Sequence, residues 1–296
     1  MIPERLSKNG TIGMFCPSHV ADKGRYDAII AALNRLGFSV KLGDNFWKDT
    51  NGYAASAEER AADLNALVTD DSVGMILFSG GDSAAEVLPY IDYESIKKHP
   101  KIFSSYSDGT SILLPIHAQT GLVTYYGAGA GEFYDLRHYD YLQFVSHFIE
   151  GHEIKTFVKD SEWKTIKGGA CEGTLIGGYA GLFALMFGNT YFKYNKEKKY
   201  LLFLEDYEIF GGTGRVATYL AGISQSGFMN NVTGLIFGHY AENPSEDFYR
   251  LLERFADKHG IPVVYTDDFG HGTRHAIFPI GTDAKLDADK RLLEFI

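Results

Sequence analysis

Three serines within four positions make residues 101–114, KIFSSYSDGTSILL, the first place to look for chemistry. A serine hydroxyl is a poor nucleophile unless it lies on a tight, exposed turn beside backbone N–H donors and a general base. Ser107 follows a predicted strand and precedes a predicted helix, whereas Ser104 and Ser105 still belong to the strand or its turn. The N–H of Asp108 would lie beside the Ser107 hydroxyl. Ser107 is therefore the candidate nucleophile, with helix capping as the alternative role.

A nucleophilic serine needs a general base, and one of the ten histidines lies in a sequence that would expose its ring. His271 stands between two glycines in residues 268–272, DFGHG, after a predicted strand at 261–265. A loop at a strand end presents an imidazole well. The other histidines lie among charged, aromatic or helical neighbours or, for His19, after the first predicted strand. His271 is therefore the candidate base, unless it is a turn residue with no role.

A third group should hold the base in position, and two carboxylates end the apolar run at 200–204, YLLFL. Glu205 and Asp206 follow this run directly. A carboxylate at the end of a buried strand is costly unless a charge or a hydrogen-bond donor partners it. One of the two is therefore expected to orient the imidazole, as the acid of a Ser-His-acid triad does. The alternative is a loop acid that caps the next helix.

The first half of the chain alternates predicted strands and helices. Apolar or alternating runs predict strands at 11–15, 38–42 and 73–78, and apolar residues at helical spacing lie between them. This βαβαβ pattern predicts a parallel sheet covered by helices, in a Rossmann-like or flavodoxin-like α/β domain. Ligands of such sheets bind beyond the carboxyl ends of the strands, so the loops at 79–83 and 105–109 matter most.

A second, mixed α/β domain is predicted for the rest of the chain. The 296 residues are too many for one average domain. The sequence turns polar between about 144 and 168, and predicted strands and helices alternate again beyond it. We predict an N-terminal domain at 1–150 that carries the serine, a linker at 151–168, and a C-terminal domain at 169–296 that carries the glutamate and the histidine.

The composition excludes several classes of partner. The formal net charge is −10, and no basic cluster would neutralise phosphates, so neither nucleic acid nor an anionic membrane is expected as a partner. No apolar run is long enough to span a membrane or to act as a signal peptide. Cys16 and Cys171 are too few for a disulfide framework. Together these features predict a cytoplasmic location.

The sequence contains no motif for a metal or a cofactor. Residues 147–152, HFIEGH, lack the spacing of the H-E-x-x-H and H-x-x-E-H zinc motifs. The glycine-rich stretches at 127–131 and 211–215 lack the patterns that bind phosphates, and are interpreted as hinges or loops that allow close approach. We therefore expect neither a metal nor a cofactor.

Five sequence blocks occur in the order seen in a known family, over nearly the whole chain. They are GYAASAEERAADLN at 52–65, GGDSAAEVLPYIDY at 80–93, HPKIF with SYSDGTS at 99–111, LLFLED at 201–206 and DFGHG at 268–272. In this combination the chain resembles the LD-carboxypeptidase family of serine peptidases. That family includes the muramoyl-tetrapeptide carboxypeptidases and the microcin C immunity peptidases.

The resemblance implies roles for individual residues. The serine of the family's G-Y-S-D motif falls on Ser107, the glutamate of its L-E-D motif on Glu205, and the histidine of its F-G-H motif on His271. The resemblance also implies a homodimer and a reaction that needs no metal. It therefore selects among the alternatives that the residues alone leave open.

An oxyanion hole is implied by the same resemblance. Its donors would be the amide of Asp108 and a glycine of the turn formed by Gly80 and Gly81. Two positions depart from the family pattern: Ser105 replaces the glycine of G-Y-S-D, and residues 125–128, YYGA, replace an H-G-P sequence near the substrate. The second departure bears on substrate identity.

Three further side chains are candidates for contacting a substrate. Arg274, three residues after His271, could bind a carboxylate, with a surface salt bridge as the alternative. Tyr126 lies in the second departure from the family pattern. Trp163 could stack on a nucleobase, with a linker or core tryptophan as the alternative.

We therefore expect a serine carboxypeptidase that acts on a small peptide-like substrate and releases the terminal D-Ala of an L,D-linked muropeptide tetrapeptide. An alternative within the family is cleavage of a peptidyl-nucleotide antibiotic of the microcin C type. The block SGGDSAAE at 79–86 leans toward that alternative, whereas FGHG at 269–272 leans toward the carboxypeptidases. An alternative from another class is a catalytically silent protein that binds a small ligand.

Overall fold

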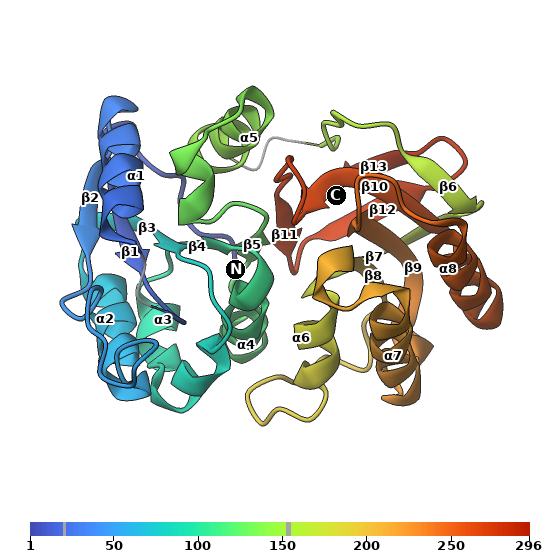
Figure 1. Ribbon diagram of the computed structural model, residues 1–296, viewed down its shortest axis with the longest axis horizontal. Coiled ribbons are helices and arrows are strands. Elements are labelled where there is room, and N and C mark those ends of the chain that lie inside the picture. Colours follow the sequence, from blue (N-terminus) through green and yellow to red (C-terminus); the bar gives the residue numbers. More distant parts are fainter. Residues whose placement is uncertain (20–21, 152–154) are drawn as a thin grey trace.

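Two β-sheets, one for each half of the chain, form the framework of the molecule (Figure 1). The computed structural model describes residues 1–19, 22–151 and 155–296. Helices pack around both sheets, so the predicted α/β class with a mainly parallel first sheet and a mixed second sheet is confirmed. Within the described residues, no helix is both long and apolar enough to cross a membrane.

The first sheet has the strand order β11-β5-β4-β3-β1-β2. Its strands are β1 (Thr11–Phe15), β2 (Ser39–Leu42), β3 (Val73–Phe78), β4 (Ile102–Ser105), β5 (Thr124–Tyr126) and β11 (Phe278–Ile280). Neighbouring strands are parallel except β11, which pairs antiparallel with β5. Both β3 and β4 are buried along nearly their whole length, and β3, VGMILF, is accordingly a near-continuous apolar run.

Five helices accompany this sheet: α1 (Lys23–Arg35), α2 (Ala57–Thr69), α3 (Tyr93–Lys98), α4 (Thr110–Thr120) and α5 (His138–Phe144). Shorter helical turns are η1 (Ala84–Tyr90), η2 (Ser107–Gly109), η3 (Ala130–Tyr134) and η4 (Val145–Glu150). Helix α2 begins at a capping box in which Ser56 and Glu59 each bond the other's backbone N–H. Helix α4 ends where Gly121 adopts a left-handed conformation.

The second sheet has the order β13-β12-β7-β8-β9-β10-β6. Its strands are β6 (Lys164–Lys167), β7 (Ala170–Tyr179), β8 (Tyr200–Glu205), β9 (Val232–His239), β10 (Val263–Gly270), β12 (Asp283–Asp287) and β13 (Leu292–Phe295). Strands β7 to β10 are parallel, and antiparallel strands flank them. The accompanying helices are α6 (Ala180–Met186), α7 (Gly212–Gln225) and α8 (Glu246–His259), with short turns η5 (Glu208–Phe210) and η6 (Phe228–Asn231).

The two halves of the chain are tied together by β11. This strand comes from the C-terminal part of the chain but completes the first sheet, and it lies between the two halves in Figure 1. No sequence pattern predicted this strand, because three residues are too few to show a period. The division into 1–150 and 169–296 stays a prediction, and the predicted linker at 151–168 includes residues 152–154, which lie outside the described residues.

Candidate functional site

Ser107 lies on a strained turn directly after β4. Its φ angle is +53°, a conformation that side-chain-bearing residues rarely adopt. A strained strand-to-helix turn of this kind lifts a nucleophilic side chain above the sheet edge. The turn is tight: a Cβ on Gly109 would lie 2.1 Å from the hydroxyl of Ser105. Ser107 is partly exposed, whereas Ser105 is 1% exposed, so only Ser107 is presented to a ligand.

A chain of hydrogen bonds joins Ser107 to residues of the second sheet. The Oγ of Ser107 lies 2.9 Å from Nε2 of His271, and Nδ1 of His271 lies 2.8 Å from Oε2 of Glu205. A carboxylate can only accept, so Nδ1 carries the proton and leaves Nε2 free to accept from the serine hydroxyl. Glu205 ends β8, and His271 follows the last residue of β10. The structure thus brings together all three residues predicted for a triad.

Tyr126 links the nucleophile to the carboxylate by a second route. Its hydroxyl donates to Oε1 of Glu205 at 2.5 Å and accepts the backbone N–H of Ser107 at 3.0 Å. Burial, together with the Glu205 carboxylate, holds the pKa of Tyr126 well above its ordinary value, so the hydroxyl stays protonated and donates. Since its side chain is fully buried, this placement favours a positioning role; the predicted substrate contact of Tyr126 stays a prediction.

Replacing Tyr126 by phenylalanine should lower the free energy of unfolding by about 1–3 kcal/mol, because it leaves a buried carboxylate oxygen and a buried N–H without partners. Urea denaturation measures the change. Tyr53→Phe is the matched control, since the Tyr53 hydroxyl bonds Glu86 at the surface, and that change should cost under about 1 kcal/mol. Equal losses in the two variants would contradict the bridging role.

The residues predicted to form an oxyanion hole lie beside this turn. The Asp108 carboxylate accepts from the Ser18 hydroxyl at 2.5 Å and from the N–H of Ala84 at 2.9 Å, and burial raises its pKa. Gly81 has a φ angle of +145°, and a Cβ there would lie 2.1 Å from Cβ of Ser18, so only glycine fits. Around Gly80 there is open space. The N–H of Ser107 already donates to Tyr126, so any oxyanion donors must be other N–H groups. The predicted role of Asp108, Gly80 and Gly81 as these donors stays a prediction.

Aromatic side chains surround the imidazole of His271. Their ring centroids lie 5.0–6.1 Å from its own, and they belong to Tyr106, Tyr179, Tyr207 and Phe210. Burial among them works to lower the pKa of His271, but the Glu205 carboxylate outweighs it and the pKa is raised. None of these four rings was predicted from the sequence. Their positions could have indicated them, because Tyr106 follows β4, Tyr179 ends β7 and Tyr207 follows β8, at the strand ends where ligands of parallel sheets bind.

The sequence of this chain matches one family of known proteins in both halves. Residues 12–127 match the N-terminal domain and residues 172–286 the C-terminal domain of LD-carboxypeptidases. A putative carboxypeptidase of Vibrio cholerae is 31% identical and aligns over 96% of this chain and 94% of its own length. The chain belongs to the LD-carboxypeptidase family. Its resemblance to that family, predicted from the sequence blocks, is therefore confirmed.

Other relatives of this chain carry more specific names. A probable murein peptide carboxypeptidase of Bacillus subtilis is 28% identical over 98% of this chain and 92% of its own. The microcin C7 self-immunity protein MccF of Escherichia coli is 26% identical over 97% and 93%. The crystal structure of an MccF-like protein from Bacillus anthracis superposes with a TM-score of 0.90 at 25% identity, covering 100% of this chain and 99% of that one.

Asp206, the alternative to Glu205 in the sequence, lies beside the candidate site but outside the hydrogen-bond chain. It is 1% exposed; its Oδ1 accepts the N–H of Tyr207 at 2.7 Å, and the Tyr179 hydroxyl lies beside the carboxylate. Burial raises its pKa to about 6. The charged form is therefore disfavoured in the fold, and the stability that the neutral form contributes is lost as pH rises from about 4 through about 6.

Asp206→Asn should therefore raise the free energy of unfolding by about 1–3 kcal/mol near pH 7.5, and change it little near pH 4, where the native aspartate is already neutral. The asparagine oxygen can still accept the N–H of Tyr207. Urea denaturation at the two pH values provides the measurement. A gain of equal size at both would contradict the buried-charge explanation.

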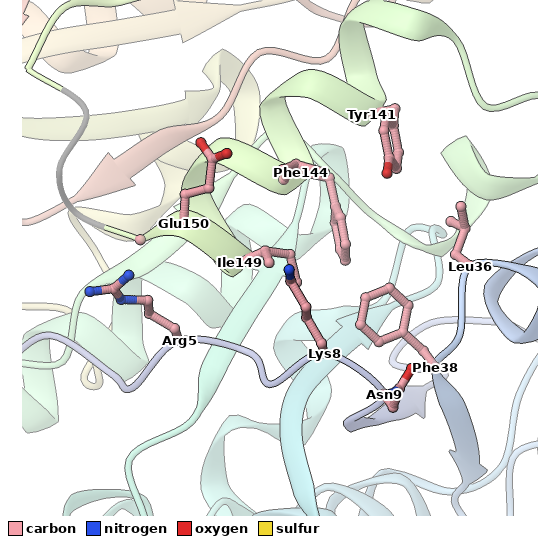
Figure 2. A pocket seen from close by; sticks show the side chains of 11 residues that line it. Arg5, Lys8, Asn9, Leu36, Phe38, Tyr141, Phe144, Ile149 and Glu150 are labelled. Carbon is pink, nitrogen blue, oxygen red and sulfur yellow. The ribbon is translucent and has the colours of Figure 1, made fainter.

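A cavity of about 880 Å³ lies away from the triad, among the N-terminal segment, α1, α5 and η4 (Figure 2). Its apolar lining includes Phe38, Phe144 and Ile149, and Lys8 and Glu150 carry charge on its wall. It contains no serine, cysteine or histidine that could act as a nucleophile or a base. The residues predicted to do chemistry thus lie in the hydrogen-bond chain and not in this cavity.

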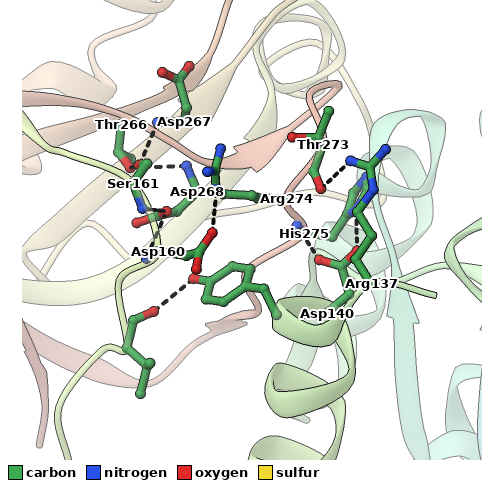
Figure 3. Close-up of polar contacts among 12 residues, drawn as sticks. Arg137, Asp140, Asp160, Ser161, Thr266, Asp267, Asp268, Thr273, Arg274 and His275 are labelled. Atoms are coloured by element: carbon green, nitrogen blue, oxygen red, sulfur yellow. Dashed lines mark hydrogen bonds and ion pairs between the residues drawn. The ribbon is translucent and has the colours of Figure 1, made fainter. Parts of the chain in front are cut away.

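The other two predicted substrate contacts are engaged within the protein. Nε of Arg274 donates to Asp160 at 2.5 Å, as Figure 3 shows, and the pair is partly exposed. Trp163 is 2% exposed, and its Nε1 donates to Asp268 at 2.7 Å. Base stacking by Trp163 would require its ring to leave this position. The substrate roles of both residues stay predictions.

Proposed function

We propose that this protein is a serine LD-carboxypeptidase that releases the terminal D-Ala from an L,D-linked muropeptide tetrapeptide. The observation that carries the proposal is the unbroken chain of hydrogen bonds from Ser107 through His271 to Glu205. Each bond has the length and order that nucleophilic catalysis by a serine requires. Membership of the LD-carboxypeptidase family and the likeness to a murein peptide carboxypeptidase support the reaction class.

The residues would act in the following order. Nε2 of His271 takes the proton of Ser107 as Oγ attacks the carbonyl carbon of the terminal peptide bond. The tetrahedral oxyanion is stabilised by backbone N–H groups, for which Asp108 and the Gly80–Gly81 turn are the candidates. Glu205 fixes the tautomer and stabilises the imidazolium, which then protonates the leaving amine. Water, activated by the same base, hydrolyses the acyl-enzyme and restores Ser107.

The aromatic rings around His271 fit this sequence of steps. They shield the hydrogen bonds of the triad from bulk water, which strengthens the attraction between the imidazolium and the Glu205 carboxylate.

The pH dependence of activity follows from the raised pKa of His271. Catalysis needs the neutral imidazole, so kcat/KM should fall about tenfold per pH unit below a pKa that lies above the ordinary value of about 6.5. A profile of kcat/KM between about pH 5 and 9 measures this acid limb. A limb that lies below about pH 6 would contradict the influence of the Glu205 carboxylate on His271.

Mass-resolved hydrolysis of two substrates tests the proposed reaction. A muropeptide tetrapeptide and a peptidyl-adenylate analogue are incubated side by side with wild-type protein and with Ser107→Ala. The proposal predicts loss of one alanine residue from the tetrapeptide with wild type and no loss with the variant. Cleavage of the nucleotide conjugate alone would overturn the muropeptide assignment.

The likeness to MccF over nearly the whole chain favours one second candidate, a peptidyl-nucleotide immunity peptidase with the same triad. The buried position of Trp163 gives that candidate no stacking platform at this residue. A catalytically silent binding protein is the remaining rival. Turnover of either substrate would exclude it, whereas no turnover and no labelling of Ser107 by a fluorophosphonate would support it.

A further inference from the structure

We infer that the cavity next to the Ser107 turn is a subsite for the terminal carboxylate of the substrate, with Arg25 as its cation. The inference rests on the proposed function, since a carboxypeptidase releases a residue that carries a free carboxylate. The cavity measures about 320 Å³, at the small end of ligand pockets, which suits a single small residue. Both loops that the sequence marked as the place for ligands, 79–83 and 105–109, contribute to its walls.

The cavity lies at the carboxyl edge of the first sheet. Its walls come from the residues that follow β1, β3 and β4, from the start of α1, and from the glycine-rich stretch after β5. Ser79 and Gly80 belong to the loop predicted to supply an oxyanion donor, and Tyr106 directly precedes the candidate nucleophile. This edge is where ligands of parallel sheets bind.

Arg25 supplies a cation that makes no ion pair with the described residues. No Asp or Glu oxygen of the described residues lies within 4 Å of its guanidinium, whose recorded contact is the ring of Tyr134, at 5.1 Å. The neighbouring Asp22 uses its carboxylate to accept the backbone N–H of Arg25 at 2.8 Å and so caps α1. The guanidinium is thus placed on the cavity wall with its hydrogen-bond donors available.

One buried polar atom of the cavity wall lacks a partner within the described residues. Nδ1 of His19 makes no hydrogen bond there, whereas the hydroxyl of Ser79, a residue that is 2% exposed, lies beside the hydroxyl of Tyr26. Burial raises the pKa of the adjacent Tyr26 to about 12, so that hydroxyl stays neutral. Unpartnered polar atoms in a buried wall are costly, and a polar ligand is one way to satisfy them.

The glycine-rich stretch keeps the cavity open. A Cβ on Gly129 would lie 3.2 Å from the carbonyl oxygen of Phe78, and one on Gly131 would lie 3.7 Å from Nη2 of Arg25. A Cβ on Gly129 would be a tight contact, whereas one on Gly131 would be in ordinary van der Waals contact with the guanidinium. The interpretation of this stretch as a hinge or a close-approach loop stays a prediction; here it would make room for the ligand of Arg25.

Tyr106 connects the cavity to the base. Its ring lines the cavity and lies 5.4 Å, centroid to centroid, from the imidazole of His271. A residue whose carboxylate is bound by Arg25 would therefore be separated from His271, which protonates the leaving amine, only by the ring of Tyr106. The other cation beside the site, Arg215, already donates to the hydroxyls of Tyr179 and Tyr219 and is not a wall of this cavity.

Calorimetric binding to the Ser107→Ala variant tests the subsite without turnover. The ligands are Nα-acetyl-L-lysyl-D-alanine and its C-terminal amide, which differ only at the carboxylate. We expect the acid to bind about tenfold more tightly than the amide. Adding Arg25→Met should abolish this preference, Arg25→Lys should keep part of it, and the matched control Arg215→Met should leave it unchanged. Arg25 is exposed, so its replacement is compatible with folding, which thermal unfolding checks.

Equal binding of acid and amide to Ser107→Ala, or a preference that survives Arg25→Met, would overturn the inference. Hydrolysis of the same dipeptide by the wild-type protein is measured in parallel. Absence of hydrolysis with an intact Arg25-dependent preference would count against the proposed reaction while supporting the carboxylate subsite, so the two failures are distinguishable.

Discussion

Ser107→Ala should lower kcat/KM by about 10⁴-fold or more and leave the fold intact. The change removes only Oγ, whose recorded partner is Nε2 of His271, and it keeps the backbone N–H that bonds Tyr126. Without Oγ no acyl-enzyme can form, and what remains is water attack assisted by the rest of the site. Steady-state hydrolysis of the tetrapeptide measures the loss.

Ser105→Ala is the matched control for this prediction. Ser105 lies two residues earlier, is buried, and its hydroxyl makes one long bond of 3.3 Å to the carbonyl oxygen of Tyr106. Its replacement should keep kcat/KM within about tenfold of wild type. If Ser107→Ala retained activity, or Ser105→Ala lost as much, the assignment of the nucleophile would be wrong.

Glu205→Gln should lower kcat by about 10³-fold to 10⁴-fold. Glu205 accepts from His271 through one oxygen and from Tyr126 through the other, so an amide of the same shape must present an NH₂ group to one of two donors. The substitution also removes the negative charge that raises the pKa of His271. The acid limb of the pH profile should therefore move to lower pH in this variant.

The next residue provides the control. Asp206→Asn alters the neighbouring buried carboxylate, which bonds neither Ser107 nor His271, and should leave kcat within about tenfold of wild type. A large loss in Asp206→Asn with little loss in Glu205→Gln would show that the sequence resemblance selected the wrong carboxylate.

The three candidate triad residues could be predicted from the sequence because each lies at the carboxyl end of a strand. Ser107 follows β4, Glu205 ends β8 and His271 follows β10, and each of these strands begins with buried apolar residues. Local pattern alone left Glu205 and Asp206 equivalent. Only the order of motifs in the family separated them, and the hydrogen bond to His271 agrees with that choice.

What the sequence could not show depends on contacts between distant segments. The bridge made by Tyr126 requires β5 to pair with β4. It also requires Tyr126 of the first sheet to reach Glu205 of the second sheet, which is 79 residues further along the chain. The partner of Trp163, Asp268, is equally remote, at a separation of 105 residues. No local period or motif carries such pairings, because they arise from tertiary packing rather than from local propensity.

Labelling with a fluorophosphonate, followed by peptide mass mapping, tests the central claim most directly. We expect a single covalent adduct on Ser107 in the wild-type protein and no adduct on Ser107→Ala. The adduct should form much more slowly on Glu205→Gln, because Ser107 is activated only while Glu205 holds His271 in position as a base. Ser105→Ala should be labelled like wild type. An adduct on another residue, or no adduct on protein that hydrolyses the tetrapeptide, would contradict the account.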